Sequence, residues 1–257
     1  MLFRSRQRVG YPFHLGRALH SPADPAGMPT IYLQSCSGGL FEGDDLALSL
    51  RAGAQSQAHV TTGAATIVHG MERDPAIHRV DLDVGAGAFL EYLPDPTILF
   101  SRACLDTSVH LRLHPGATAI IGDSLLLHDP AGGGTPFGWL RSETRVESTE
   151  GRLLACDRFL VSGETFSRRL PGITGASTAQ GSLFILGAGN ASALVDLLRG
   201  ALDQPGCYGG AGLLPNQAGA WARMLAVDAA ALRMAMFAAW SAARNMLTGA
   251  APQHRRK

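Results

Sequence analysis

The fold is indicated most clearly by residues 79–93, RVDLDVGAGAFLEYL. Val80, Leu82 and Val84 alternate with polar residues, which is the period of a half-buried β-strand. The pair Gly87-Ala88 follows this strand, and a second apolar run begins directly after the pair. Because glycine readily adopts the positive φ of a tight turn, the segment predicts a strand, a turn and a second strand.

The same strand-turn-strand pattern recurs on both sides of this segment. In each copy the first apolar residue lies seven positions before a Gly-Ala pair, and these pairs are Gly53-Ala54, Gly87-Ala88 and Gly116-Ala117. A weaker fourth copy places Val146 before Gly151, and the four glycines are spaced 34, 29 and 35 residues apart. Recurrence at about 20–50 residues is typical of stacked repeat units. We therefore predict a mainly β fold, a β-solenoid or layered β-helical sheets built from these units, with an ordinary antiparallel sandwich as the alternative.

Helical patterns are found near the C-terminal end. Asn190 is a candidate N-cap for a helix over 191–199, and Gly200 would end it. Asp228 is a candidate N-cap for a longer helix that reaches Leu247. The apolar stripe of the longer helix has helical spacing and consists of Leu232, Met236, Trp240, Ala243 and Leu247.

These patterns predict one domain over 1–257. Its part 28–187 would be β-rich and its part 190–250 helical. The segments 129–138 and 203–220 are rich in glycine and proline, which predicts loops.

The composition of the 257 residues excludes several function classes. With 46% hydrophobic residues and a net charge of +1, the chain resembles neither a disordered protein nor a basic nucleic-acid binder. Its only lysine is Lys257, which excludes a phosphate loop with an interior lysine, a Schiff-base enzyme and a kinase-type nucleotide site. The four cysteines form no CxxC pair, which argues against a zinc ribbon. We see no secretory signal or membrane span, and so expect a cytoplasmic protein.

Two groups of polar residues are candidate sites. The segment 35–45, SCSGGLFEGDD, suits either a phosphate cradle or a tight turn with solvated acids. His59, His69 and His78 precede Glu91 and Asp95, and imidazole with carboxylate suits nickel or zinc. A lone strand histidine is, however, more often structural. No GxSxG or HExxH motif occurs, so we predict no catalytic residues.

Several blocks, in order, resemble the urease accessory proteins UreD/UreH. They are Tyr32-Leu33-Gln34-Ser35, Gly38-Gly39-Leu40, Gly43-Asp44, Thr61-Thr62, Ala64-Ala65-Thr66, the block 90–98 with sequence LEYLPDPTI, a strand pair from Gly151 to Leu160, and the closing helix with Trp240 and Arg244. The chain departs from the family pattern after Thr66, where Ile67, His69 and Gly70 occur, and over 128–134, where an expected Arg and Glu are absent.

The resemblance implies a non-enzymatic chaperone with a β-rich, solenoid-like fold and C-terminal helices. It also implies the partners UreF, the GTPase UreG and apo-urease, and nickel passing through an internal channel, with no nucleotide, nucleic acid or membrane bound by this chain. On this basis Asp44, Glu91 and Asp95 are candidate nickel-path residues, with His59 and His69 beside them. Two alternatives remain: a metal-dependent β-solenoid or cupin-like hydrolase using His59, His69 and Glu91, and a purely structural interaction module.

Overall fold

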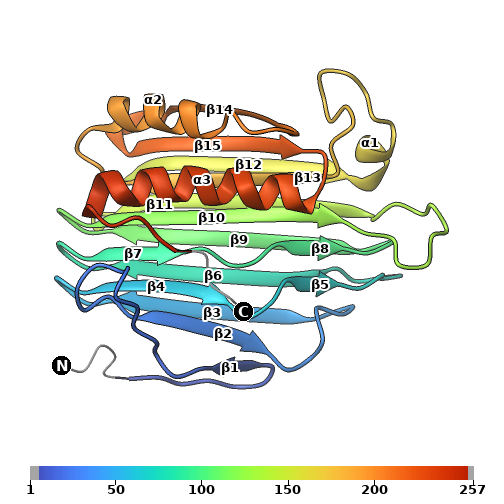
Figure 1. The fold of residues 1–257 in the computed structure, drawn as a ribbon. Coiled ribbons are helices and arrows are strands. Elements are labelled where there is room, and N and C mark those ends of the chain that lie inside the picture. Colours follow the sequence, from blue (N-terminus) through green and yellow to red (C-terminus); the bar gives the residue numbers. More distant parts are fainter. Residues whose placement is uncertain (1–5, 254–257) are drawn as a thin grey trace.

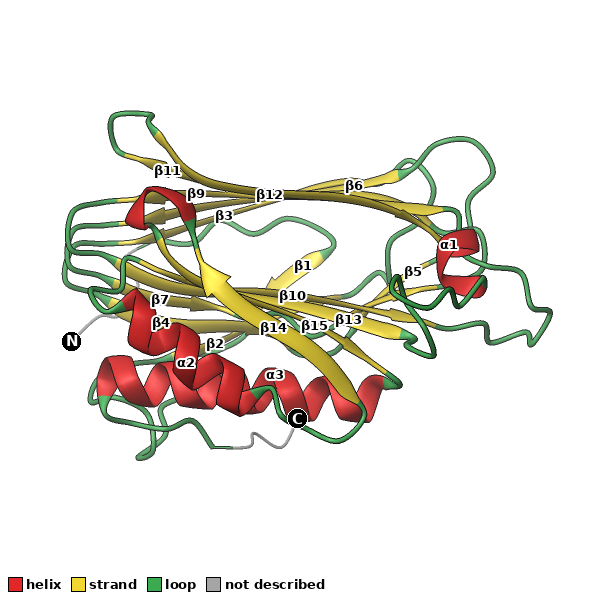
Figure 2. Cartoon of the chain, turned by 90° about the horizontal axis from the view of Figure 1, so that it is seen from above, coloured by secondary structure: helices red, strands yellow, loops and turns green. Residues whose placement is uncertain are grey.

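The computed structural model describes residues 6–253, in which two β-sheets stack face to face and two helices cover the outer face of the larger sheet (Figures 1 and 2). Lys257 lies outside the described residues. The five-stranded sheet has the order β12-β11-β9-β6-β3 and contains β3 (Asp45–Ala52), β6 (Ala76–Val84), β9 (Cys104–Leu113), β11 (Trp139–Ser148) and β12 (Leu153–Ser162).

The larger sheet has ten strands within the described part of the chain, and its main path is β1-β2-β4-β7-β10-β13-β15-β14. These strands are β1 (Phe13–Leu15), β2 (Thr30–Ser35), β4 (Gln57–Thr62), β5 (Thr66–Val68), β7 (Phe89–Tyr92), β8 (Thr97–Leu99), β10 (Thr118–Leu127), β13 (Ala179–Leu186), β14 (Cys207–Leu213) and β15 (Gly219–Ala226). The helices are α1 (Gly163–Ser167), α2 (Ala191–Ala201), α3 (Ala229–Thr248) and the short 3-10 turn η1 (Pro215–Gln217).

The predicted solenoid is confirmed in the N-terminal half. Three units run from the smaller sheet through a four-residue turn into the larger one, as β3 to β4, β6 to β7 and β9 to β10. The units stack in parallel in both sheets, β3 on β6 on β9 and β4 on β7 on β10. Apolar residues of alternating strand positions, such as Val80, Leu82 and Val84, are buried between the sheets. The period-2 pattern therefore determines which residues form the core between the two sheets.

The alignment of the first repeat is shifted by two residues from the prediction. Leu48 pairs with Val80, and Val80 with Val109, so Leu48 and not Leu46 is equivalent to Val80. The positive φ of the first turn accordingly falls on Gln55 (58°), where the next two turns have Gly87 (64°) and Gly116 (70°). A shift of two residues keeps every side chain on the same face of its strand, and so the fold prediction survives it.

The fourth copy is not a solenoid unit. After β11, which is parallel to β9, the chain turns at 149–152 and β12 returns antiparallel to β11 in the same sheet. The place next to β10 in the larger sheet is taken by β13, which runs antiparallel to β10. Stacking of parallel units ends there, and the last strands form an antiparallel extension.

Both predicted helices are confirmed, together with their N-caps, but α2 continues through Gly200, which was predicted to end it, and has Leu202 as its C-cap. The Asn190 side chain accepts a hydrogen bond from the Ala193 N–H, and the Asp228 side chain accepts one from Ala231 N–H. Gly249 ends α3 in the left-handed conformation, with φ 73°. None of the described helices is both long and apolar enough to cross a membrane.

The loop prediction is correct for 129–138 and wrong for 203–220. The latter contains β14 and leads into β15, so the C-terminal part expected to be helical also supplies two strands. The sequence of β14, CYGGAGL, has no apolar alternation. The strand forms because its backbone pairs with β15 along its whole length, which a pattern of side chains does not reveal.

Candidate functional site

A buried cluster of charged residues lies between the larger sheet and α3. Glu91 on β7 is fully buried, and His59 on β4 is paired directly with it in the parallel register. His59 Nδ1 lies 2.8 Å from Glu91 Oε2, and Trp240 of α3 donates from Nε1 to Glu91 Oε1 over 2.9 Å. The His59 ring also stacks on Trp240, with 5.1 Å between ring centroids. Both oxygens of Glu91 thus have protein partners.

Arg244 extends this cluster to the N-terminal segment. Its guanidinium is fully buried, with Nε 3.4 Å from Glu91 Oε1, and its Nη2 donates to Asp24 Oδ1 over 2.9 Å. It also lies over the Trp240 ring, 5.6 Å from the centroid. Within residues 6–253, the Nε and Nη1 groups have no hydrogen-bond partner. Two carboxylates therefore compensate one buried cation, and the contacts fasten α3 to the sheet.

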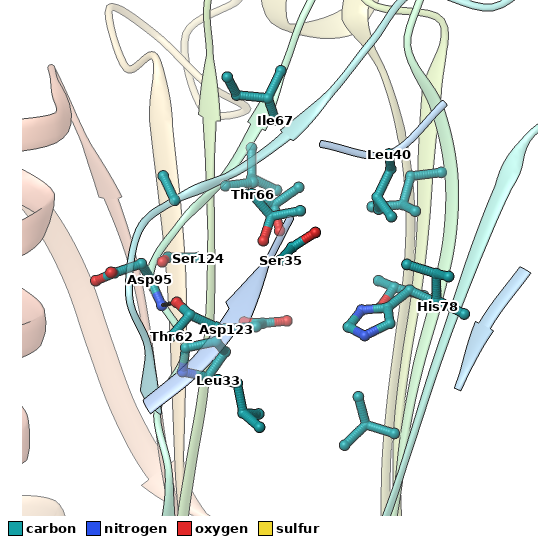
Figure 3. Close-up of a pocket in the computed structure, with 18 of the residues that line it drawn as sticks. Leu33, Ser35, Leu40, Thr62, Thr66, Ile67, His78, Asp95, Asp123 and Ser124 are labelled. Atoms are coloured by element: carbon teal, nitrogen blue, oxygen red, sulfur yellow. Dashed lines mark hydrogen bonds between the residues drawn. The ribbon is translucent and has the colours of Figure 1, made fainter. Parts of the chain in front are cut away.

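A second candidate site is a cavity of about 460 Å³ between the two sheets, in which polar side chains lie among apolar ones (Figure 3). Asp123 of β10 extends into it from the larger sheet, and His78 of β6 faces it from the smaller sheet. Hydroxyl groups of Ser35, Thr62 and Thr66 also lie on its wall (Figure 3). No cysteine occurs among the described residues that line it. The donors available to a ligand in this cavity are therefore carboxylate, imidazole and hydroxyl groups.

Two of the titratable groups that line this cavity, Asp123 and His78, have shifted pKa values. Burial raises the pKa of Asp123 to about 6, although hydrogen bonding to Ser182 and the charge of Arg223 partly oppose the shift. Burial lowers the pKa of His78, which keeps its imidazole neutral and able to accept a metal ion at neutral pH. Sequence reasoning missed Asp123. A signal was nevertheless present, since Asp123 is the one carboxylate in the apolar run 118–127.

Asp123 should make stability depend on pH. Its pKa is 3.8 ordinarily and about 6 in the fold, so the folded state binds the proton more tightly and loses stability as pH rises through this window. Asp123→Asn does not titrate. As the pH rises from 4 to 7, the free energy of unfolding of the variant should therefore increase relative to that of the natural protein, by at most about 3 kcal/mol. Urea unfolding at several pH values measures this difference, and a constant difference would contradict the assignment.

The remaining predicted site residues lie elsewhere. Asp44 closes a turn, where its Oδ2 accepts from the Phe41 N–H over 2.8 Å. His69 stacks on Phe41 with 4.4 Å between centroids, and its Nε2 lies 3.3 Å from Gly38 O. Asp95 lies between β7 and β8, and its N–H donates to Thr62 Oγ1 over 2.8 Å. Of the five predicted residues, the structure thus brings only His59 and Glu91 into contact.

The segment 35–45 forms a hydrogen-bonded turn. This favours a tight turn with solvated acids over a phosphate cradle. The Glu42 carboxylate accepts from the backbone N–H groups of Glu72, Arg73 and Asp74, at 3.1, 3.0 and 3.3 Å. These bonds lower the pKa of Glu42. Across residues 6–253, no group of three or more His, Cys, Asp or Glu side chains is placed to hold a metal ion. His59, His69 and Glu91 accordingly do not form the triad that the hydrolase alternative needs.

Comparison with known proteins identifies the family. A family model described as UreD urease accessory protein matches residues 3–257. Proteins named urease accessory protein UreD 1 from Pseudomonas syringae pv. tomato and Methylorubrum extorquens are 47% and 41% identical, each over 98% of this chain and over 90% and 86% of their own lengths. A urease accessory protein UreD from Cenarchaeum symbiosum is 28% identical over 96% of this chain and 88% of its own. The resemblance found in the sequence is confirmed, and this chain belongs to the UreD family of urease accessory proteins.

Proposed function

We propose that this chain is a non-enzymatic scaffold that conducts nickel ions to apo-urease in the cytoplasm, together with a UreF partner and the GTPase UreG. Family membership supports the role in urease maturation. The observation that carries the proposal further is the cavity between the sheets, with Asp123 and His78 on opposite walls.

The donor set of the cavity suits a metal ion in transit. Carboxylate, hydroxyl and neutral imidazole groups bind a borderline divalent ion such as nickel, whereas closed sets of thiolates hold structural metals. The carboxylate and imidazole donors do not converge on one point, since no group of three or more His, Cys, Asp or Glu side chains in the described chain is placed to hold a metal ion. Such a path favours passage over permanent binding. Nickel is therefore the cargo of this chain, supplied and received by partners.

The five residues predicted from sequence contribute unequally to this path. Asp95 lines the cavity, and His59 lines the neighbouring groove under α3. Asp44, His69 and Glu91 line neither space. We therefore assign Asp95 and His59, with Asp123 and His78, to the nickel path. Glu91 instead has a structural role in the buried cluster beneath α3.

The proposal predicts that Asp123→Asn lowers urease activation when nickel is limiting. The variant keeps the shape of the side chain but loses the charge that attracts the ion, so nickel per urease and urease activity should both fall severalfold. Both are measured after co-expression with urease and its other accessory proteins. The matched control is Asp196→Asn, because the Asp196 side chain on α2 is exposed far from the cavity.

Retention of the UreF partner in a pull-down shows whether Asp123→Asn is folded and assembled. Unchanged nickel content in an assembled complex would contradict the nickel path and favour the purely structural interaction module. Such a module would lose function through surface substitutions that abolish complex formation and not through cavity substitutions.

A further inference from the structure

A groove of about 550 Å³ lies beneath α3, on the outer face of the larger sheet. Its floor includes His59, Thr61 and Ser124 from the strands, and its roof includes Met236 and Phe237 from the helix. The groove and the cavity between the sheets lie on opposite faces of the same sheet. Four residues nevertheless line both spaces: Ala65, Pro94, Asp95 and Ser124.

These shared residues lie where the backbone ladder of the larger sheet is interrupted. Strand β7 pairs with β10 up to Tyr92 and Ile121, and β8 resumes the pairing at Thr97 and Leu125. Between these pairs, the four residues 93–96 face only the three residues 122–124. Pro94 and Pro96 lie within this stretch and have no N–H to donate.

Threonine hydroxyls replace part of the lost ladder towards β4. The Thr61 hydroxyl donates to the Leu93 carbonyl over 2.7 Å, and the Thr62 hydroxyl accepts from the Asp95 N–H over 2.8 Å. The break between β4 and β5, at 63–65, lies beside the break between β7 and β8. Backbone bonds remain at both ends of this stretch, from Leu93 N–H to Val60 O and from Thr66 N–H to Pro96 O, and between them the continuous ladder is missing at one place in the sheet.

Polar side chains follow one another through this interruption. Asp123 and Ser124 are consecutive on β10, so their side chains point to opposite faces of the sheet. Figure 3 shows the Asp123 carboxylate on the cavity side and the Asp95 carboxylate on the side of α3, with Ser124 near Asp95. A cation that crosses the sheet here would meet a carboxylate on each face and a hydroxyl beside the second.

We infer that the interruption at 63–65, 93–96 and 122–124 is a lateral port, through which a divalent cation passes between the cavity and the groove beneath α3. This inference rests on the proposed function for the identity of the ion. The passage itself rests on the lining residues that the two spaces share and on the missing ladder.

The port predicts a contrast between two alanine substitutions. Ala65 lines both spaces, whereas Ala54 is exposed and lines neither. Ala65→Phe should therefore obstruct the port, and Ala54→Phe, with the same added volume, should leave it open. Nickel transfer to urease at limiting nickel should fall severalfold in the first variant and stay near the natural level in the second.

A thiol assay tests the passage without nickel. Thr107 of β9 lines the cavity beside His78, on the wall opposite the port. Thr107→Cys in a chain whose four native cysteines are replaced by serine gives a reporter for a small cationic methanethiosulfonate. Adding Ala65→Phe should slow its modification severalfold, and adding Ala54→Phe should not. Circular dichroism and retention of the UreF partner show that each variant is folded.

The outcomes separate the port from the proposed function. An unchanged modification rate in Ala65→Phe overturns the port. A slowed rate with normal nickel transfer overturns the assignment of the port to the metal, although the passage stands. A slowed rate together with a silent Asp123→Asn supports the passage and contradicts the nickel path through the cavity.

Discussion

Arg244→Ala should lower the free energy of unfolding by about 3–5 kcal/mol, because it leaves buried carboxylates without their cation. Glu91 is fully buried and Asp24 is 8% exposed, so water does not replace the guanidinium. The Trp240 ring also loses the cation that lies over it. The loss is measured by urea unfolding, with tryptophan fluorescence reporting on Trp240 of α3.

Two further variants show whether charge pairing causes the loss. Arg233→Ala also removes an arginine from α3, but Arg233 is exposed, so its effect should be within about 0.5 kcal/mol. The triple variant Asp24→Asn, Glu91→Leu and Arg244→Met should lose much less than the sum of the single losses, because it removes both buried carboxylates together with their cation and leaves no charge in the cluster. Additive losses, or a loss below about 1 kcal/mol in Arg244→Ala, would contradict the role of the cluster.

The repeated part of the fold could be predicted because its causes are local. Alternation in strands such as 80–84 and the turn positions at Gly87 and Gly116 are visible in the sequence, and each unit buries its apolar face on the next. The first turn was misaligned because Gln55 takes a conformation that sequence reasoning assigned to a glycine. The end of the repeat could not be predicted, since the position of β12 depends on β13 occupying the place beside β10.

In the candidate sites too, contacts with a local cause could be predicted, and contacts that depend on tertiary packing could not. His59 and Glu91 were predicted together and are in contact, because the repeat places them side by side on neighbouring strands. The bond of Arg244 to Asp24 joins residues 220 positions apart, and no local pattern links them. The cavity and the port are products of how sheets and helix pack. Asp123, a carboxylate within the apolar run 118–127, is the signal in the sequence for a polar group inside the cavity, and sequence reasoning did not use it.

Gly39→Ala should destabilise the fold by about 3 kcal/mol or more, because a side chain there is both strained and obstructed. Gly39 has φ 142°, a conformation that is essentially confined to glycine, and a Cβ would lie 2.5 Å from the Ile67 carbonyl oxygen. That carbonyl accepts from the Leu40 N–H over 2.7 Å, which joins the turn to β5. Since Gly39 and Leu40 both line the cavity, urease activation should fall together with stability.

Gly38→Ala is the matched control, because Gly38 also has a positive φ, 78°, but a Cβ there would meet no atom within 4 Å. Only the left-handed conformation opposes this alanine, which costs about 1–2 kcal/mol. The difference between the two variants in urea unfolding therefore measures the close approach of Gly39 to β5 and not glycine flexibility in general. Equal losses would mean that the turn moves away freely from Ile67, and that the wall of the cavity at this point is not held by the contact.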